Sequence, residues 1–120
     1  MSLVEQTAET LATVTEALPA GGEKRSGQAE MAEAVAQAIE SDGHVVVQAG
    51  TGTGKSLAYL VPTVLSKRPA IVATATKALQ DQLATKDLPF LADQLDTNFR
   101  FAVLKGRSNY LCLQLSLIHI

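Results

Sequence analysis

The sequence predicts an α/β fold in which helices flank a parallel β-sheet. Three short apolar runs, at residues 44–48, 70–76 and 99–106, alternate with segments of helical periodicity. A strand that is buried on both faces of a parallel sheet is apolar along its whole length. Such strands in alternation with helices indicate right-handed β-α-β units. The 120 residues are enough for one ordinary domain.

Two helices are expected before the first apolar run. Residues 3–18 have an amphipathic pattern that ends at the sequence PAGG. A second helix is expected from Gln28 to about Glu40, with apolar side chains on one side and a stop at the sequence SDG. Both helices therefore precede the predicted sheet in the chain.

The remaining elements follow in the order helix, strand, helix, strand. The helix after the glycine-rich loop is expected at residues 54–66, with Pro62 inside it or near its end. Residues 77–95 predict one helix that is interrupted near Pro89. The third apolar run comes directly after this helix, which completes the alternation.

Charge and composition exclude several classes of protein. The net charge of −2 lacks the basic footprint of a free-standing nucleic-acid-binding domain. One cysteine excludes an internal disulfide and fits a reducing compartment. The N-terminus does not resemble a signal peptide, and no apolar run reaches the roughly 18 residues of a membrane helix. We therefore expect a cytoplasmic protein without a membrane partner.

Residues 49–56, AGTGTGKS, form the motif that gives the best indication of a chemical function in this chain. They differ at one position from the P-loop (Walker A) pattern G-x-x-x-x-G-K-[ST], and they lie between a predicted strand and a predicted helix, as that motif requires. A glycine-rich turn with an incidental lysine would not account for this context. The predicted nucleotide-binding residues of the loop are Ala49, Gly50, Thr51, Gly52, Thr53, Gly54, Lys55 and Ser56.

Each residue type in the loop has an expected role in binding the phosphates of a nucleotide. The glycines allow positive φ angles, so that backbone N–H groups approach a polyphosphate together with the N-terminus of the next helix. The Lys55 ammonium would reach the β and γ phosphates of ATP, and the Ser56 hydroxyl would ligate Mg²⁺. Ala49 leaves the strand and can keep ordinary β-region angles, so the substitution of the first glycine costs little.

The form A-x-x-G-x-G-K-[ST] resembles motif I of superfamily 2 helicases. The wider sequence QAGTGTGKSLAYLVP is similar to the DinG branch, which is related to the XPD helicases. The resemblance implies a partial RecA-like P-loop NTPase domain: a leader helix and turn at residues 1–22 and the N-terminal part of the first ATP-binding domain at 23–114. The resemblance stops before LSLIHI, residues 115–120, which we expect to be an adapter-derived tail; a hydrophobic C-terminal strand is the alternative.

Two further stretches resemble the same family. KRSGQAEMAEAV is similar to the segment before motif I, which implies that Arg25 and Gln28 lie near the nucleotide base; an ordinary surface helix start is the alternative. VATATKALQDQL resembles motif Ia, which contacts the DNA backbone. The alternative there is a helix cap, with Thr76 capping a helix that starts at Lys77. The DNA-contact candidates are Thr74, Thr76, Lys77 and Gln80.

The sequence LKGRSNYLC resembles the entry to the iron-sulfur insertion of the branch. This likeness implies that Cys112 is the first of four ligands to a [4Fe–4S] cluster in the parent protein, whereas a lone cysteine is otherwise a small buried hydrophobe. The resemblance implies that the parent protein is a DNA helicase that hydrolyses ATP. It would move 5′ to 3′ on single-stranded or forked DNA in repair and replication. We expect a monomeric parent enzyme, with ATP and Mg²⁺ as its further cofactors.

Some parts of that enzyme are not found in the sequence. No acidic motif II and no second RecA-like domain can be located, so we expect the 120 residues alone to be inactive. A small kinase is one alternative, although it would need a phosphoacceptor site and lid arginines. A non-catalytic nucleotide-binding module is the other alternative, although the intact loop argues against it. His44 is expected to be exposed.

Overall fold

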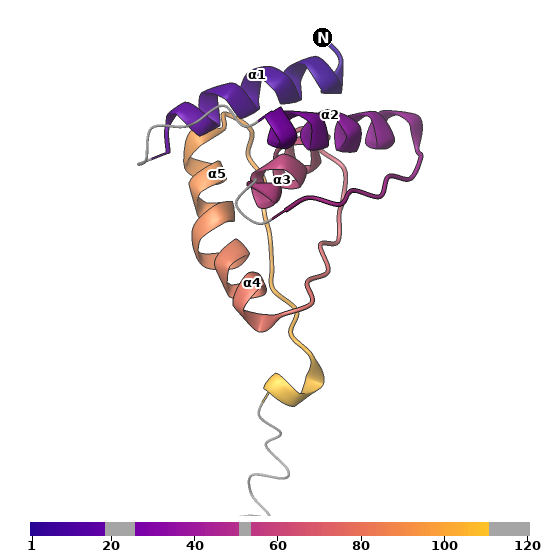
Figure 1. Cartoon of the computed structure of the whole chain (residues 1–120). Helices are drawn as coiled ribbons and strands as arrows, with labels where there is room; N and C mark the ends of the chain where they lie inside the picture. Colours follow the sequence, from indigo (N-terminus) through magenta and orange to yellow (C-terminus); the bar gives the residue numbers. More distant parts are fainter. Residues whose placement is uncertain (19–25, 51–53, 111–120) are drawn as a thin grey trace, which may run out of the picture.

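The structure is a computed structural model that describes residues 1–18, 26–50 and 54–110. In chain order its elements are α1 (Leu3–Glu16), α2 (Ser26–Ser41), α3 (Lys55–Leu65), α4 (Lys77–Gln82), the π-helical turn η1 (Leu83–Asp87), α5 (Leu88–Gln94) and the 3₁₀ turn η2 (Arg107–Asn109). Figure 1 shows α1 and α2 next to each other, with α3 beside them and α4 to α5 as a separate rod. Each predicted helix is therefore present.

The first helix is fixed at its N-terminus by a capping box. The Ser2 hydroxyl accepts a hydrogen bond from the Glu5 backbone N–H, and the Glu5 carboxylate accepts one from the Ser2 N–H. The Leu3 N–H also donates to the Glu40 carboxylate near the end of α2. Because the start of α1 meets the end of α2, the two helices run antiparallel.

The core lies where α1, α2 and α3 meet one another and the rod of η1 and α5. Ala32 and Ala36 on α2 are fully buried, and their small side chains let the helices approach closely. Arg68, just after α3, donates to the Ile39 carbonyl at 3.2 Å and pairs with Asp42 at 2.9 Å, which ties α3 to the end of α2. The core comprises Leu11, Val14, Ala32, Leu57, Ala58, Leu60, Val61, Leu83 and Leu91.

The rod from α4 to α5 explains how the chain accommodates Pro89. Proline has no N–H, and its ring would clash with the carbonyl of residue 85 in a regular α-helix. The chain widens to a π-helical turn over Leu83–Asp87, where the Leu88 N–H bonds to the Leu83 carbonyl. The predicted interruption is thus confirmed, and it occupies the turn before the proline.

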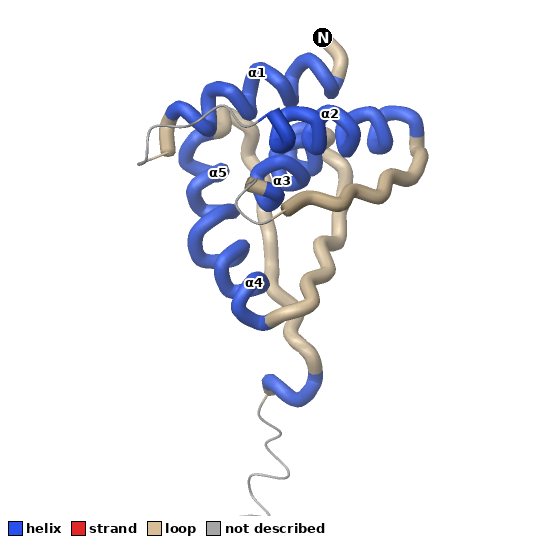
Figure 2. Tube along the Cα trace, in the orientation of Figure 1, coloured by secondary structure: helices blue, strands red, loops and turns tan. Residues whose placement is uncertain are grey.

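The three predicted strands are not formed. None of the residues that the structure describes is in a β-strand, so residues 44–48, 70–76 and 99–106 are loops and the predicted parallel sheet is not seen in the described residues (Figure 2). The apolar side chains of these runs remain in contact with solvent: Val46 is 98%, Ile71 97% and Leu104 86% exposed. An apolar run indicates that its side chains favour burial. A β-strand also needs a neighbouring strand that forms hydrogen bonds with its backbone N–H and C=O groups.

Thr7 and Thr15 lie on the buried side of α1 and differ in hydrogen bonding. The Thr15 hydroxyl donates to the Leu11 and Ala12 carbonyls, at 2.9 and 3.0 Å, whereas the buried Thr7 hydroxyl has no partner in the described residues. We predict that Thr7→Val raises the free energy of unfolding by about 1 kcal/mol. Thr15→Val, the matched control, should lower it by a similar amount, as measured by urea denaturation. Equal losses in both variants would contradict this assignment.

Asp87 ends the π-helical turn and is half-buried. Burial raises the pKa of its carboxyl above the ordinary value of 3.8, although the Gln82 hydrogen bond and the Lys86 charge lower it. The folded chain therefore holds this proton more tightly than the unfolded chain, and the resulting stability is present at acidic pH and lost as the pH rises through the folded pKa.

Replacement of Asp87 tests this pH dependence. We predict that Asp87→Asn, which cannot ionise, gains stability relative to the unchanged chain as the pH rises from about 3 to about 6. Urea denaturation across this range measures the difference, with the exposed Asp93→Asn as the control. A difference that does not vary with pH would show that Asp87 is not desolvated in solution.

Candidate functional site

The candidate site begins where the glycine-rich loop enters α3. Gly54 is the N-cap of this helix and has φ 72° and ψ 38°, in the left-handed region that favours glycine. It provides no side chain to cap the first turn, so no cap hydrogen bond blocks the N–H groups at the helix start. The predicted positive φ is confirmed at Gly54 but is not found at Gly50, and Gly52 lies outside the described residues.

The two chemical residues of the motif are the first residues of α3. Lys55 is exposed, and no described carboxylate forms an ion pair with it; Ser56 is partly exposed. Behind them the helix is buried at Leu57 and Ala58, which fixes its direction. An exposed ammonium, a hydroxyl and an uncapped helix N-terminus suit a phosphate group and its metal ion.

The rest of the loop is only partly described. Ala49 is partly buried and Gly50 is exposed, and both lie directly before the loop's centre. The predicted binding residues Thr51, Gly52 and Thr53 lie outside the described residues. The structure therefore describes the two ends of the loop, residues 49–50 and 54–56.

Gln28 connects the second helix to this loop. It is the third residue of α2, only 6% of its surface is exposed, and its Nε2 donates to the Gly54 carbonyl at 3.1 Å. The structure thus brings Gln28 to the loop; Arg25, its predicted companion, lies outside the described residues. Sequence reasoning did not find the contact with Gly54, because 26 residues separate the partners and no local pattern marks such a pair.

The predicted DNA-contact residues lie at the start of α4, apart from the phosphate loop (Figure 1). Thr76 is the N-cap of α4 and its hydroxyl accepts from the Leu79 N–H at 3.2 Å, so the cap interpretation is confirmed. The Thr74 hydroxyl donates to the Thr76 carbonyl at 3.3 Å. Lys77, the first residue of the helix, is exposed.

Gln80 has a structural contact that the sequence did not indicate. Its Nε2 donates to the Leu104 carbonyl at 3.1 Å, and next to it Lys105 pairs with Asp81 at 3.4 Å. The Tyr110 hydroxyl accepts from the Lys105 N–H at 2.8 Å. These bonds hold the segment after residue 103 against α4.

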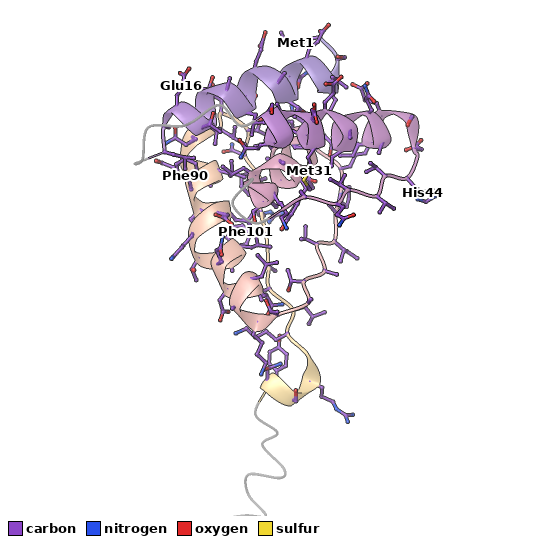
Figure 3. All side chains as sticks on the ribbon, in the orientation of Figure 1. Met1, Glu16, Met31, His44, Phe90 and Phe101 are labelled. Carbon is purple, nitrogen blue, oxygen red and sulfur yellow. The ribbon has the colours of Figure 1, made fainter. Side chains whose placement is uncertain are left out.

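Neither a metal-binding cluster nor a membrane-spanning helix is found among the described residues. In the described ranges no three residues among His, Cys, Asp and Glu gather closely enough to hold a metal ion. Cys112 lies outside the described residues. Within residues 1–18, 26–50 and 54–110, no helix combines the length and the apolar character needed to cross a membrane. His44 is exposed as predicted and points away from the protein, whereas Met31 lies inside it (Figure 3).

Comparison with known proteins agrees with the motif analysis. The DEAD/DEAH box helicase family matches residues 25–113. The chain is 56% identical over 113 residues to the "ATP-dependent helicase DinG" of Mycobacterium tuberculosis, which covers 88% of this chain and 17% of that protein. It is 50% identical over 101 residues to the "ATP-dependent DNA helicase YoaA" of Escherichia coli, which covers 84% and 16%.

A third relative is named for a different activity. The "3'-5' exonuclease DinG" of Bacillus subtilis is 42% identical over 104 residues, or 83% of this chain and 11% of that protein. No solved structure matches the chain. The chain spans about a sixth of the length of the first two relatives, and the predicted likeness to DinG proteins is confirmed.

The family match includes the loop, the start of α3 and the segment around α4, and it implies a RecA-like P-loop fold. It includes Gln28 but not α1. The exposed Lys55 and Ser56 at an uncapped helix start, together with these relatives, lead to one conclusion: this chain belongs to the DEAD/DEAH box helicase family.

Proposed function

We propose that the chain carries the ATP-binding loop of an ATP-dependent DNA helicase of the DinG type. The observation that carries the proposal is the start of α3, where Gly54, Lys55 and Ser56 stand at an open helix N-terminus. The names of the DinG and YoaA relatives support ATP and DNA as the ligands. The complete protein would hydrolyse ATP and move 5′ to 3′ on single-stranded or forked DNA, in repair or replication.

The residues at the loop have separate roles in binding Mg-ATP. The N–H groups at the start of α3 would donate to phosphate oxygens, and Lys55 would neutralise the charge of the β and γ phosphates. Ser56 would hold Mg²⁺ through its hydroxyl oxygen. Bound Mg²⁺ supplies further charge neutralisation during phosphoryl transfer. Glycine at position 54 fits this ligand, because it has no side chain that would cover the start of the helix.

The complete domain would also contain the predicted sheet. We infer that residues 44–48, 70–76 and 99–106 become strands when neighbouring strands are available to them. Their exposed apolar side chains support this inference, because a strand in a parallel sheet is buried on both faces. The phosphate loop would then follow the end of the first strand, as in other P-loop proteins.

The start of α4 is the proposed contact with the DNA backbone. Lys77 is exposed and can pair with a phosphate, and the Thr76 hydroxyl, which accepts from Leu79, still has its own proton to donate. Thr74 and Gln80 hold this corner in shape through their hydrogen bonds, at 3.3 and 3.1 Å. Such contacts position a strand without reading its sequence.

A [4Fe–4S] cluster does not fit this chain alone. Such a cluster takes four cysteine ligands, and the chain contains one cysteine. Cys112 would therefore be one ligand in the complete protein, with the other three supplied by residues that this chain lacks. No step of the binding or hydrolysis of ATP described above depends on the cluster.

Lys55→Ala tests the phosphate-binding role. We predict that it weakens Mg-ATP binding to the chain by roughly 10- to 100-fold, because a charge-assisted contact contributes about 1.5 to 3 kcal/mol. Isothermal titration calorimetry measures the affinity. Lys86→Ala, which removes the same charge at an exposed position in η1, is the control and should leave it unchanged. Equal affinity in the Lys55 variant would mean that ATP does not use the loop.

The 120-residue chain should bind ATP but not turn it over. The loop holds phosphates, but hydrolysis also needs an acidic residue to orient the attacking water and a second domain to stabilise the charge. We predict no increase in phosphate release when single-stranded DNA is added to the chain with Mg-ATP. DNA-stimulated turnover by this chain would contradict the prediction.

A further inference from the structure

The segment after residue 103 is attached to α4 by two side-chain contacts. Gln80 Nε2 donates to the Leu104 carbonyl at 3.1 Å. The Lys105 ammonium pairs with the Asp81 carboxylate at 3.4 Å. Both residues of α4 share a face with Lys77, because positions three and four apart are neighbours on a helix surface. The segment that leads into η2 is therefore brought to the face of α4 that carries Lys77.

The Tyr110 ring is fixed at its polar end and accessible elsewhere. Its hydroxyl accepts a hydrogen bond from the Lys105 N–H at 2.8 Å. The turn between them is closed by Asn109, whose backbone N–H and side-chain amide both donate to the Gly106 carbonyl, at 2.9 and 3.2 Å. Tyr110 is nevertheless 52% exposed. The turn thus holds an aromatic ring in place and leaves about half of the residue open to a ligand.

Positive charge accompanies this ring. Lys77 at the start of α4 and Arg107 in η2 are both exposed, and neither pairs with a carboxylate among the described residues. Lys105 is the third cation, and it shares its charge with Asp81. We call Lys77, Arg107 and Tyr110 the Tyr110 surface. It combines two unpaired cations with an accessible aromatic ring.

The opposite charge is found on α1 and α2, which lie at the other end of the molecule from η2 (Figure 1). Neither helix contains a lysine or an arginine. Their acidic residues are Glu5, Glu9, Glu16, Glu30, Glu33 and Glu40. Such a separation of charge attracts a polyanion to one end of a protein and repels it from the other. The Tyr110 surface is therefore at the end that favours a polyanion.

We propose that Tyr110 stacks against a base of single-stranded DNA, while Lys77 and Arg107 pair with phosphates of the same strand. A cationic surface with an accessible aromatic ring holds a single strand in this way without reading its sequence. In a duplex the faces of the bases are covered by their neighbours, so the ring selects unstacked DNA. The proposal rests on the proposed DNA contact at the start of α4, and it adds a base contact to one that involves the backbone alone.

Strands with and without bases test the stacking. We expect Tyr110→Ala to lower the affinity for a labelled oligothymidylate by about 5- to 100-fold, and to leave the affinity for an abasic strand of equal length unchanged. Fluorescence anisotropy at low salt measures both affinities. Tyr110→Phe, which keeps the ring, should retain most of the affinity for oligothymidylate. An equal loss for the two strands, or no loss for either, would overturn the proposal.

Lys77→Ala separates this proposal from the proposed function. It should weaken the binding of both strands, because it removes a phosphate contact. A loss in this variant with none in Tyr110→Ala would leave the proposed DNA contact standing and overturn the stacking. No binding of either strand by the unchanged chain would overturn both.

The salt dependence of binding tests the role of Arg107. We expect Arg107→Ala to reduce the slope of log affinity against log salt concentration by about 0.7, the value for one phosphate contact on a single strand. Tyr110→Ala should leave the slope unchanged, because stacking releases no counterions. Lys86→Ala, at an exposed position in η1, is the control for Arg107 and should also leave it unchanged. An unchanged slope in the Arg107 variant would contradict its phosphate contact.

Tyrosine fluorescence reports the stacking directly. The chain contains two tyrosines and no tryptophan. Tyr59→Phe keeps the ring that packs against the core and leaves Tyr110 as the only tyrosine. Because stacking on a base quenches tyrosine emission, we expect oligothymidylate to lower the emission of this variant and the abasic strand to leave it unchanged. Constant emission at saturating oligothymidylate would overturn the proposal.

Discussion

The burial of α3 is the constraint on which the rest of the structure depends. Leu57, Ala58, Leu60 and Val61 form the centre of the core, and α1, α2 and η1 all pack against this helix. Full burial of one such side chain contributes roughly 1.5 to 3 kcal/mol, so the helix cannot shift without a large loss. The direction of α3 is therefore fixed by apolar packing before any ligand is present.

This constraint connects the core to the candidate site. Helix α3 is buried from Leu57 onward, whereas its first residue, Lys55, is exposed to solvent. The lysine is therefore attached to a helix whose position is fixed by packing. Packing consequently fixes the position of the proposed phosphate-binding groups at the helix start, and Gly54 adds a left-handed turn directly before it.

How much the sequence could predict depends on the range of the interactions. The helices and the cap at Thr76 were predictable because they rest on periodicity and on contacts within a few residues. The loop motif was recognisable because its residues are adjacent in the chain, and of its predicted conformation the positive φ at Gly54 is confirmed. The hydrogen bond from Gln28 to Gly54 spans 26 residues and has no local signal. Strands are not formed at such runs in the described residues, because residues such as Ile71 show a preference for burial without showing which neighbouring strand would satisfy their backbone groups.

The two candidate ligand surfaces are held by different kinds of contact. The loop exit depends on a long-range bond to a buried amide, whereas the corner at Thr76 depends on its own cap and on the bond from Gln80 to Leu104. Leu83 in η1 and Leu91 in α5 belong to the same core cluster as the buried residues of α3. Because packed interiors resist small displacements, a movement of the rod that carries Thr76 would reach α3 through these packed side chains. Pro89 forces the π-helical turn that contains Leu83, so this proline also shapes the connection between the two surfaces.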